Sequence, residues 1–313
     1  MAERGVFQKI NSLTEVKRNK GIDLVKVLMA FVVVSIHTTA WPLLGIREVA
    51  VPYFFIVSGF FLFGKMTGDR AQDLAVIRAW TLKILKLYLI WTAVYLPFTV
   101  YGYVHDGLSL KQSLAVFVRN LAFVGENFMS WPLWYLLSLI WGGVLFYLLR
   151  TLKVPVWGML LVGILLFALP RIPGVVESGI YRKLFRDGTN LVWTGPMYLA
   201  IGGLLQHYNS RIPLWGGIFL FITGLMVFQY TWVALPFAAA GLFLLAREIP
   251  LPWISDRLSR AFRDGSETIY LVHMIFAALL ILLAGLDKGA LLFTLTSLLA
   301  AATAFGRYKW KTR

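Results

Sequence analysis

The sequence predicts an all-α integral membrane protein with about ten transmembrane helices and with both chain termini in the cytoplasm. Composition gives the class: 59% of the 313 residues are hydrophobic and only 14% are charged, with a mean hydropathy of +0.73. Soluble domains average about 25% charged residues, so a chain this apolar lacks the polar surface that water requires. The topology follows from the basic residues, which gather between the apolar runs.

The same distribution excludes a nucleic-acid partner. A formal net charge of +15 would otherwise indicate one, but these cations flank apolar runs, where membrane topology places them. The chain has no cysteine, which excludes disulfides and Cys-ligated metal sites. Its 4 histidines show no helical pair at i and i+4, so we expect no metal.

Ten apolar runs are long enough to cross a bilayer, which takes about 20 residues. They lie at residues 22–42, 48–66, 84–104, 131–149, 154–170, 190–206, 213–229, 231–247, 267–285 and 289–305. The first 21 residues are polar and basic and lack the apolar core of a signal peptide. We therefore predict a cytoplasmic segment 1–21, a membrane domain 22–306 and a cytoplasmic tail 307–313.

The positive-inside rule orients this domain. With the N-terminus inside, 21 of the 30 Lys and Arg residues fall in cytoplasmic segments and 8 fall outside. An even number of spans then returns the C-terminus to the cytoplasm.

Two outer loops are longer than a turn requires. Residues 105–130 contain the partly amphipathic stretch LKQSLAVFVRNLAFV, which is typical of a helix lying in the membrane interface. Residues 171–189 carry four basic residues against the local rule. That excess is either noise or a surface that meets an anionic acceptor.

The first span carries two titratable groups, Lys26 and His37, in the stretch KVLMAFVVVSIH. Eleven helical steps place them on one face, about 16 Å apart along the axis. An ionisable residue inside a span is a functional-site hypothesis by default. Lys26 also fits snorkelling to the headgroups or pairing with Asp23. His37 fits either a neutral hydrogen-bonded histidine or a general base.

The second span begins VPYFFIVSGFFLF, in which Ser58 and Gly59 would allow close helix packing. A basic stretch follows, with Arg78, Lys83 and Lys86. It fits either the positive-inside bias or a cytoplasmic patch for an anionic, phosphate-bearing cofactor.

Five features in chain order together resemble the acyltransferase-3 family of bacterial integral-membrane acyltransferases. They are Lys26, ten residues and His37; VPYFFIVSGFF at 51–61; the basic pair Lys83 and Lys86; Trp134, Tyr135 and Leu136; and SETIYLVH at 266–273, which ends in His273. The resemblance covers nearly the whole chain.

This resemblance implies a ten-span enzyme of the bacterial cytoplasmic membrane. Such an enzyme moves an acyl group, usually acetyl, from cytoplasmic acyl-CoA to a hydroxyl of a cell-envelope carbohydrate or related acceptor. His37 would be the general base or the acyl-carrying nucleophile, and Lys26 would stabilise the donor. The remaining implied site residues are Arg78, Lys83, Lys86 and Ser58 for the donor, and Trp134, Tyr135 and His273 for the acceptor. His273 fits either a group that orients the acceptor or a core histidine.

Two other function classes stay open. Ten spans with buried His and Lys would also suit a transporter of a small polar or envelope-precursor substrate. A sensory or binding module is the third class, and no feature favours it. Consumption of the thioester separates an enzyme from a transporter. The sequence leaves a homo-oligomer open.

Overall fold

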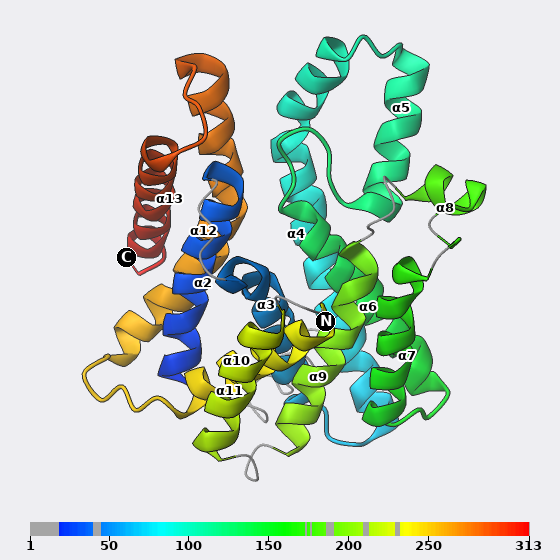
Figure 1. Cartoon of the computed structure of the whole chain (residues 1–313), viewed down its shortest axis with the longest axis vertical. Helices are drawn as coiled ribbons and strands as arrows, with labels where there is room; N and C mark the ends of the chain where they lie inside the picture. Colours follow the sequence, from blue (N-terminus) through cyan, green and yellow to red (C-terminus); the bar gives the residue numbers. More distant parts are fainter. Residues whose placement is uncertain are drawn as a thin grey trace, which may run out of the picture.

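The computed structural model describes residues 19–39, 45–172, 174–175, 177–185, 191–208, 213–228 and 232–312. All regular elements in these ranges are helices (Figure 1). Most of the predicted cytoplasmic segment 1–21, part of the loop 171–189 and Arg313 lie outside them.

A helix lies at each of the ten predicted positions. These helices are α2 (Lys20–Thr38), α3 (Ile46–Phe63), α4 (Arg70–His105), α6 (Leu133–Thr151), α7 (Val156–Ala168), α9 (Gly195–His207), α10 (Leu214–Phe228), α11 (Leu235–Glu248), α12 (Asp256–Ala284) and α13 (Ala290–Lys311). Shorter elements connect them: α5 (Leu110–Arg119), the π-helix η2 (Asn120–Val124), α8 (Gly179–Leu184), and the 3₁₀ helices η3 (Leu169–Arg171), η4 (Leu191–Thr194) and η5 (Trp232–Ala234).

Within the described residues, six helices are long and apolar enough to cross a membrane: α2, α3, α4, α6, α12 and α13. This is the composition of a helical membrane protein. The helices α7, α9, α10 and α11 have 13 to 15 residues each, which is shorter than a perpendicular crossing of the hydrocarbon core requires.

Two helices begin well before the predicted spans. Helix α4 starts at Arg70 and α12 at Asp256, where side chains of Asp69 and Ser255 cap the free backbone N–H groups. No Gly or Pro interrupts α4 before Pro97. The basic stretch with Arg78 is therefore helical rather than the loop that hydropathy indicated, because capping and not hydropathy sets where a helix begins.

Helices α2 and α12 lie side by side and run in the same direction (Figure 1). Ser259 Oγ donates to the Asp23 carboxylate at 2.6 Å near their starts. The rings of His37 and His273 meet further along both helices. We call the end of the molecule where α2 begins the Lys26 end, and the end where α2 stops the His37 end.

Helices α3 and α9 pack closely because glycines face each other across the contact. A Cβ on Gly59 would fall on the Leu199 carbonyl oxygen, and one on Gly202 on the Ile56 carbonyl oxygen. The packing role predicted for Gly59 thus agrees with the structure. This contact brings the second span beside the start of α9, which contributes to the pocket described below.

Helix α5 stands beyond the C-terminal end of α4 at the top of Figure 1, and none of its residues is buried. Ser109 and Gln112 form a capping box at its start. Leu110, Leu114 and Val118 are 77%, 56% and 62% exposed and follow helical spacing on one side. The interface location remains a prediction, and this apolar stripe supports it.

Candidate active site

A pocket of about 500 Å³ lies at the His37 end of the molecule, within the usual size range of ligand sites, roughly 300–1,000 Å³. His37 lines it near the C-terminal end of α2. Its other walls come from α12, from the beginnings of α3, α6, α9 and α11, from the segment before α6, and from the end of α7 and the residues that follow it. These walls include Phe55, Trp131, Trp134, Phe167, Tyr198 and Tyr270, together with the charged residues Arg47, Glu48, Glu126 and Arg171.

His37 lies between two aromatic rings. The centroid of the Trp131 ring is 5.4 Å from that of His37, with a tilt of 36°. The centroid of the His273 ring is also 5.4 Å away, and the two imidazoles are nearly parallel at 24°. The structure thus brings together two histidines that are 236 positions apart. His37 is half-buried and borders the pocket, whereas His273 is fully buried behind it.

The hydrogen bonds of His273 determine its tautomer. Its Nδ1 lies 2.8 Å from the carbonyl oxygen of Tyr270 and 3.2 Å from that of Ile269. Carbonyl oxygens only accept, so Nδ1 carries the proton and Nε2 of the neutral ring is an acceptor. Nε2 has no hydrogen-bond partner among the described residues. It is chemically suited to accept a hydrogen bond from a group placed beside His37.

Three hydroxyl groups belong to an aromatic cluster that meets His273 through the ring of Tyr270, 6.2 Å from the imidazole. Ser58 Oγ and Tyr135 Oη are 3.0 Å apart, and Tyr135 Oη donates to the Phe54 carbonyl at 3.3 Å. Tyr270 Oη donates to the Pro132 carbonyl at 3.2 Å, and its ring meets Tyr135 edge-on. Trp134 lines the pocket, whereas Ser58 and Tyr135 lie behind its wall. Of the predicted site residues, His273 contacts the His37 ring and Trp134 lines the same pocket, whereas Tyr135 and Ser58 are linked to His273 only through the ring of Tyr270.

A polar network orders the segment that carries Trp131. Asn127 Oδ1 accepts from Tyr103 Oη at 2.5 Å and from Asn120 Nδ2 at 2.8 Å. Ser130 Oγ accepts from the Asn127 backbone N–H at 2.7 Å. Asn120 begins the π-helix η2, an element that often marks a functional site. The network holds Trp131 against His37 without contacting the pocket itself.

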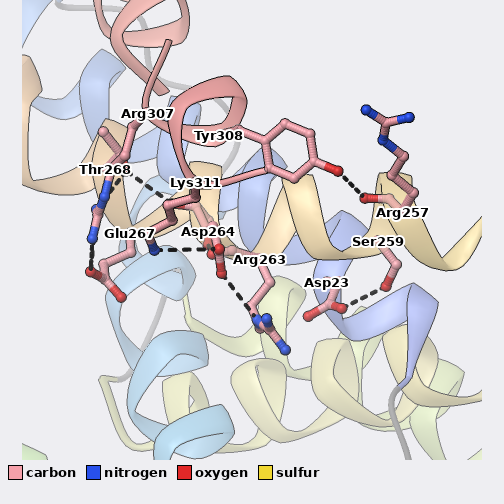
Figure 2. Close-up of polar contacts among 11 residues, drawn as sticks. Asp23, Arg257, Ser259, Arg263, Asp264, Glu267, Thr268, Arg307, Tyr308 and Lys311 are labelled. Carbon is pink, nitrogen blue, oxygen red and sulfur yellow. Dashed lines mark hydrogen bonds and ion pairs between the residues drawn. The ribbon is translucent and has the colours of Figure 1, made fainter. Parts of the chain in front are cut away.

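The Lys26 end has a different character (Figure 2). Lys26 is half-buried, and the charges of Asp23, Arg263, Asp264 and Glu267 act on its ammonium group. Three of these four groups are carboxylates. Asp23 accepts the hydrogen bond from Ser259 and also lies in electrostatic range of Lys26, its predicted partner.

The predicted donor cations Arg78, Lys83 and Lys86 lie on the first half of α4 and are exposed. No ion pair is formed by any of them within the described ranges. They belong to the Lys26 end of the molecule, because α4 follows the end of α3, which runs antiparallel to α2. The structure does not bring them into contact with His37.

Sequence reasoning missed Arg47, Glu126, Trp131, Arg171 and Lys288. The sequence did carry a sign of three of them. The basic residues counted on the outer side include Arg47, Arg171 and Lys288, and Arg171 begins the loop 171–189 with its excess of basic residues. Trp131 stands at the first position of the predicted span 131–149, and periodicity does not show what a residue at the end of a span contacts. Among the described residues, no three His, Asp or Glu side chains form a candidate metal site.

Comparison with known proteins gives two kinds of match. A serine/alanine racemase of Enterococcus gallinarum is 29% identical over 220 residues, which is 63% of this chain and 30% of the relative. An amino-acid racemase of Enterococcus faecalis is 28% identical over 225 residues, 64% of this chain and 30% of the relative. The chain thus corresponds to less than a third of the length of these relatives. No solved structure matches.

The family comparison covers far more of the chain. The model of the acyltransferase-3 family, described as an acyltransferase domain, matches residues 19–306. That range includes the motifs around Lys26, His37 and His273 and nearly all of the described helices. The chain therefore belongs to the acyltransferase-3 family.

Proposed function

We propose that the protein transfers an acyl group, acetyl in the usual case, from cytoplasmic acyl-CoA to a hydroxyl of a cell-envelope carbohydrate or related acceptor. The observation that carries the proposal is the position of His37. It borders a pocket of about 500 Å³ at one end of α2, while exposed cations occupy the other end. Donor and acceptor would approach the reacting position from opposite ends of the molecule.

The chemistry assigns one role to each end. His37 takes the proton of the acceptor hydroxyl as general base. The acceptor oxygen attacks the thioester carbonyl, the C–S bond breaks, and the thiolate of CoA leaves and takes up a proton. His273 accepts a hydrogen bond at Nε2 and orients the reacting group. Trp134 forms the acceptor wall, while Ser58 and Tyr135 support it.

The donor would be held by charge. Phosphate groups of CoA suit the exposed cations Arg78, Lys83 and Lys86, and the pantetheine arm would pass Lys26 on its way to His37. Lys26, beside its carboxylates, then orients the arm and stabilises local charge. The distance of about 16 Å between Lys26 and His37 suits an extended arm rather than direct contact between phosphate and His37.

This scheme needs the predicted topology. We propose ten spans in the bacterial cytoplasmic membrane with the Lys26 end inside. The parallel direction of α2 and α12 agrees with it, because a first and a ninth span run the same way. The short helices α7, α9, α10 and α11 would cross with the help of their connecting segments or of a locally thinner bilayer.

Transport of a small polar solute is the alternative. Two observations favour it. The pocket carries two Arg and two Glu side chains, which suits a zwitterion. The two relatives compared above are named as racemases of amino acids. A transporter would also be expected to bind its substrate near the bilayer midplane and to contain inverted repeats.

The deciding experiment measures consumption of acetyl-CoA by the purified protein in detergent, with and without a hydroxyl acceptor, beside uptake of labelled L-serine into liposomes. The enzyme predicts release of free CoA that an acceptor accelerates, and no uptake. Uptake without thioester consumption would replace the enzyme by the transporter.

A further inference from the structure

Most of the described buried tyrosines form a hydrogen bond to the protein itself through their hydroxyl groups. Tyr95 Oη, for example, donates to the Leu271 carbonyl at 2.7 Å. Tyr198 is different, because it is 2% exposed and its Oη has no hydrogen-bond partner among the described residues. A buried hydroxyl without a partner costs free energy, and such a group in a native structure calls for an explanation.

The place of Tyr198 in the fold suggests that explanation. It lines the pocket at the His37 end, as Tyr270 does. The Tyr270 hydroxyl is bound by the protein, because it donates to the Pro132 carbonyl at 3.2 Å. Arg171 also lines the pocket and its charge acts on the Tyr198 phenol, but the hydroxyl forms no hydrogen bond with it. Of these two tyrosines in the pocket wall, Tyr198 is the one whose hydroxyl the described residues do not bind.

Packing fixes the position of this side chain. The Tyr198 ring lies nearly parallel to that of Phe55, at 14° with 6.4 Å between centroids, and it meets the Phe167 ring edge-on at 6.0 Å. Gly59, one turn after Phe55, lies against the backbone of Leu199, the residue that follows Tyr198. The phenol is therefore held by its neighbours in one place, as a group that determines specificity must be. Its hydroxyl is buried in the wall, where a hydrogen bond is stronger than in water.

We propose that Tyr198 is a specificity-determining residue of the pocket, and that its hydroxyl donates a hydrogen bond to an oxygen of the acceptor other than the one that receives the acyl group. The acceptor is then a compound with at least two hydroxyl groups, one of which meets His37 and the other Tyr198. Ligand pockets typically combine apolar and aromatic walls with a few polar groups that fix the orientation of the ligand. The inference rests on the proposed acyl transfer for its catalytic meaning, but its test measures binding.

The test compares glucose with its 2-deoxy, 3-deoxy and 6-deoxy analogues, each of which lacks one hydroxyl. Calorimetry measures their binding to the full-length protein in detergent, as wild type and as Tyr198→Phe. We expect one analogue to bind the wild type about threefold to tenfold more weakly than glucose, the value of one neutral hydrogen bond. Tyr198→Phe should weaken glucose by a similar factor and bind this analogue as the wild type does, because each change removes the same contact.

Thermal unfolding separates this role from a structural one. Tyr53→Phe is the matched control, since Tyr53 is 0% exposed and is not among the pocket-lining residues, and its Oη donates to the Ile22 carbonyl at 3.3 Å. We expect Tyr53→Phe to lower the Tm and to leave glucose binding unchanged. Tyr198→Phe should leave the Tm unchanged or raise it, because it removes a buried hydroxyl that no protein group binds.

Two results would overturn the proposal. One is a decrease in the Tm of Tyr198→Phe as large as that of Tyr53→Phe. The other is binding of glucose and of every analogue to Tyr198→Phe as to the wild type, which includes the case in which none of them binds. Consumption of acetyl-CoA is measured in parallel. If glucose binds through Tyr198 but no acetyl-CoA is consumed, the acyltransferase proposal fails and the role of Tyr198 in binding stands.

Discussion

The two ends of the α2–α12 pair balance their cations differently. At the Lys26 end, Arg307 pairs with Glu267, Lys311 with Asp264 and Arg263 with Asp264, as Figure 2 shows. At the His37 end, Lys288 lies over an aromatic ring and has no described carboxylate partner. The first arrangement neutralises charge and ties α13 to α12, whereas the second places a lysine against an aromatic ring that borders the pocket.

The difference suggests a division of labour along one helix. Paired charges at the Lys26 end hold the helices in register. The exposed cations Arg78, Lys83 and Lys86 on α4 form no ion pair within the described ranges, and in the proposed scheme they bind the donor. At the His37 end, several polar and charged side chains instead line the pocket. Variants at the two ends should therefore separate into stability effects and activity effects.

The largest stability effect is expected for Asp73→Ala at the Lys26 end. Asp73 is 1% exposed, and its Oδ2 accepts from Arg150 Nη2 at 2.7 Å, which joins α4 to α6. Removing one partner of a buried ion pair costs about 3–5 kcal/mol because the other charge is left uncompensated. Thermal unfolding in detergent should show a large decrease in Tm. A Tm equal to that of the exposed-residue variant Asp106→Ala would contradict this assignment.

A smaller loss is expected for Ser259→Ala. Its hydroxyl donates to the buried Asp23 carboxylate at 2.6 Å, and the variant removes this hydrogen bond at a cost of about 1–3 kcal/mol. The contrast is Ser297→Ala on α13, since Ser297 Oγ is buried and has no described hydrogen-bond partner. Ser297→Ala should be neutral or stabilising. If both variants lowered the Tm equally, the Asp23–Ser259 contact would not be what holds α2 to α12.

At the His37 end, Tyr135→Phe should reduce stability by about 1 kcal/mol, because it removes one hydroxyl that contacts Ser58 Oγ and the Phe54 carbonyl. Its turnover should fall less than that of a variant at His37, since Tyr135 lies behind the pocket wall. Paired measurements of Tm and acetyl-CoA consumption distinguish these effects. Complete loss of turnover with an unchanged Tm would make Tyr135 a catalytic residue and contradict the supporting role.

The smallest effect is expected for Arg307→Gln. The side chains of Arg307 and Glu267 are 37% and 48% exposed, and their closest approach is 3.4 Å. Exposed pairs contribute about 0–1 kcal/mol and are screened by salt. The difference in Tm from the wild type should be small at low salt and should disappear at high salt. A large difference that persists in salt would show that the hydrogen bond to Thr268 dominates this contact.

The sequence predicted the positions of the helices well because hydropathy reports them directly. A helix lies at each predicted span, and the family resemblance is confirmed by the match to residues 19–306. Helix starts were less predictable. Caps at Asp69 and Ser255 extend α4 and α12 beyond their apolar runs, and hydropathy alone does not detect a capping side chain.

The candidate site was predictable only in part. His37 and Lys26 were visible because charged or titratable groups stand out in an apolar span. The stacking of His273 on His37 was not, because no local pattern shows that two helices 236 positions apart run in parallel. The contact of Lys288 with Trp131 depends likewise on a turn that meets the end of α2 through Gly289 and Thr38.

The most direct test of the division of labour measures acetyl-CoA binding and turnover in two variants side by side, His37→Gln and Lys83→Gln/Lys86→Gln, with Lys111→Gln as control. Loss of a general base lowers turnover by about 10²–10⁴-fold, so His37→Gln should bind acetyl-CoA like the wild type and barely consume it. The lysine double variant should bind more weakly and regain turnover at high acetyl-CoA. Wild-type turnover in His37→Gln would contradict the central role of this histidine.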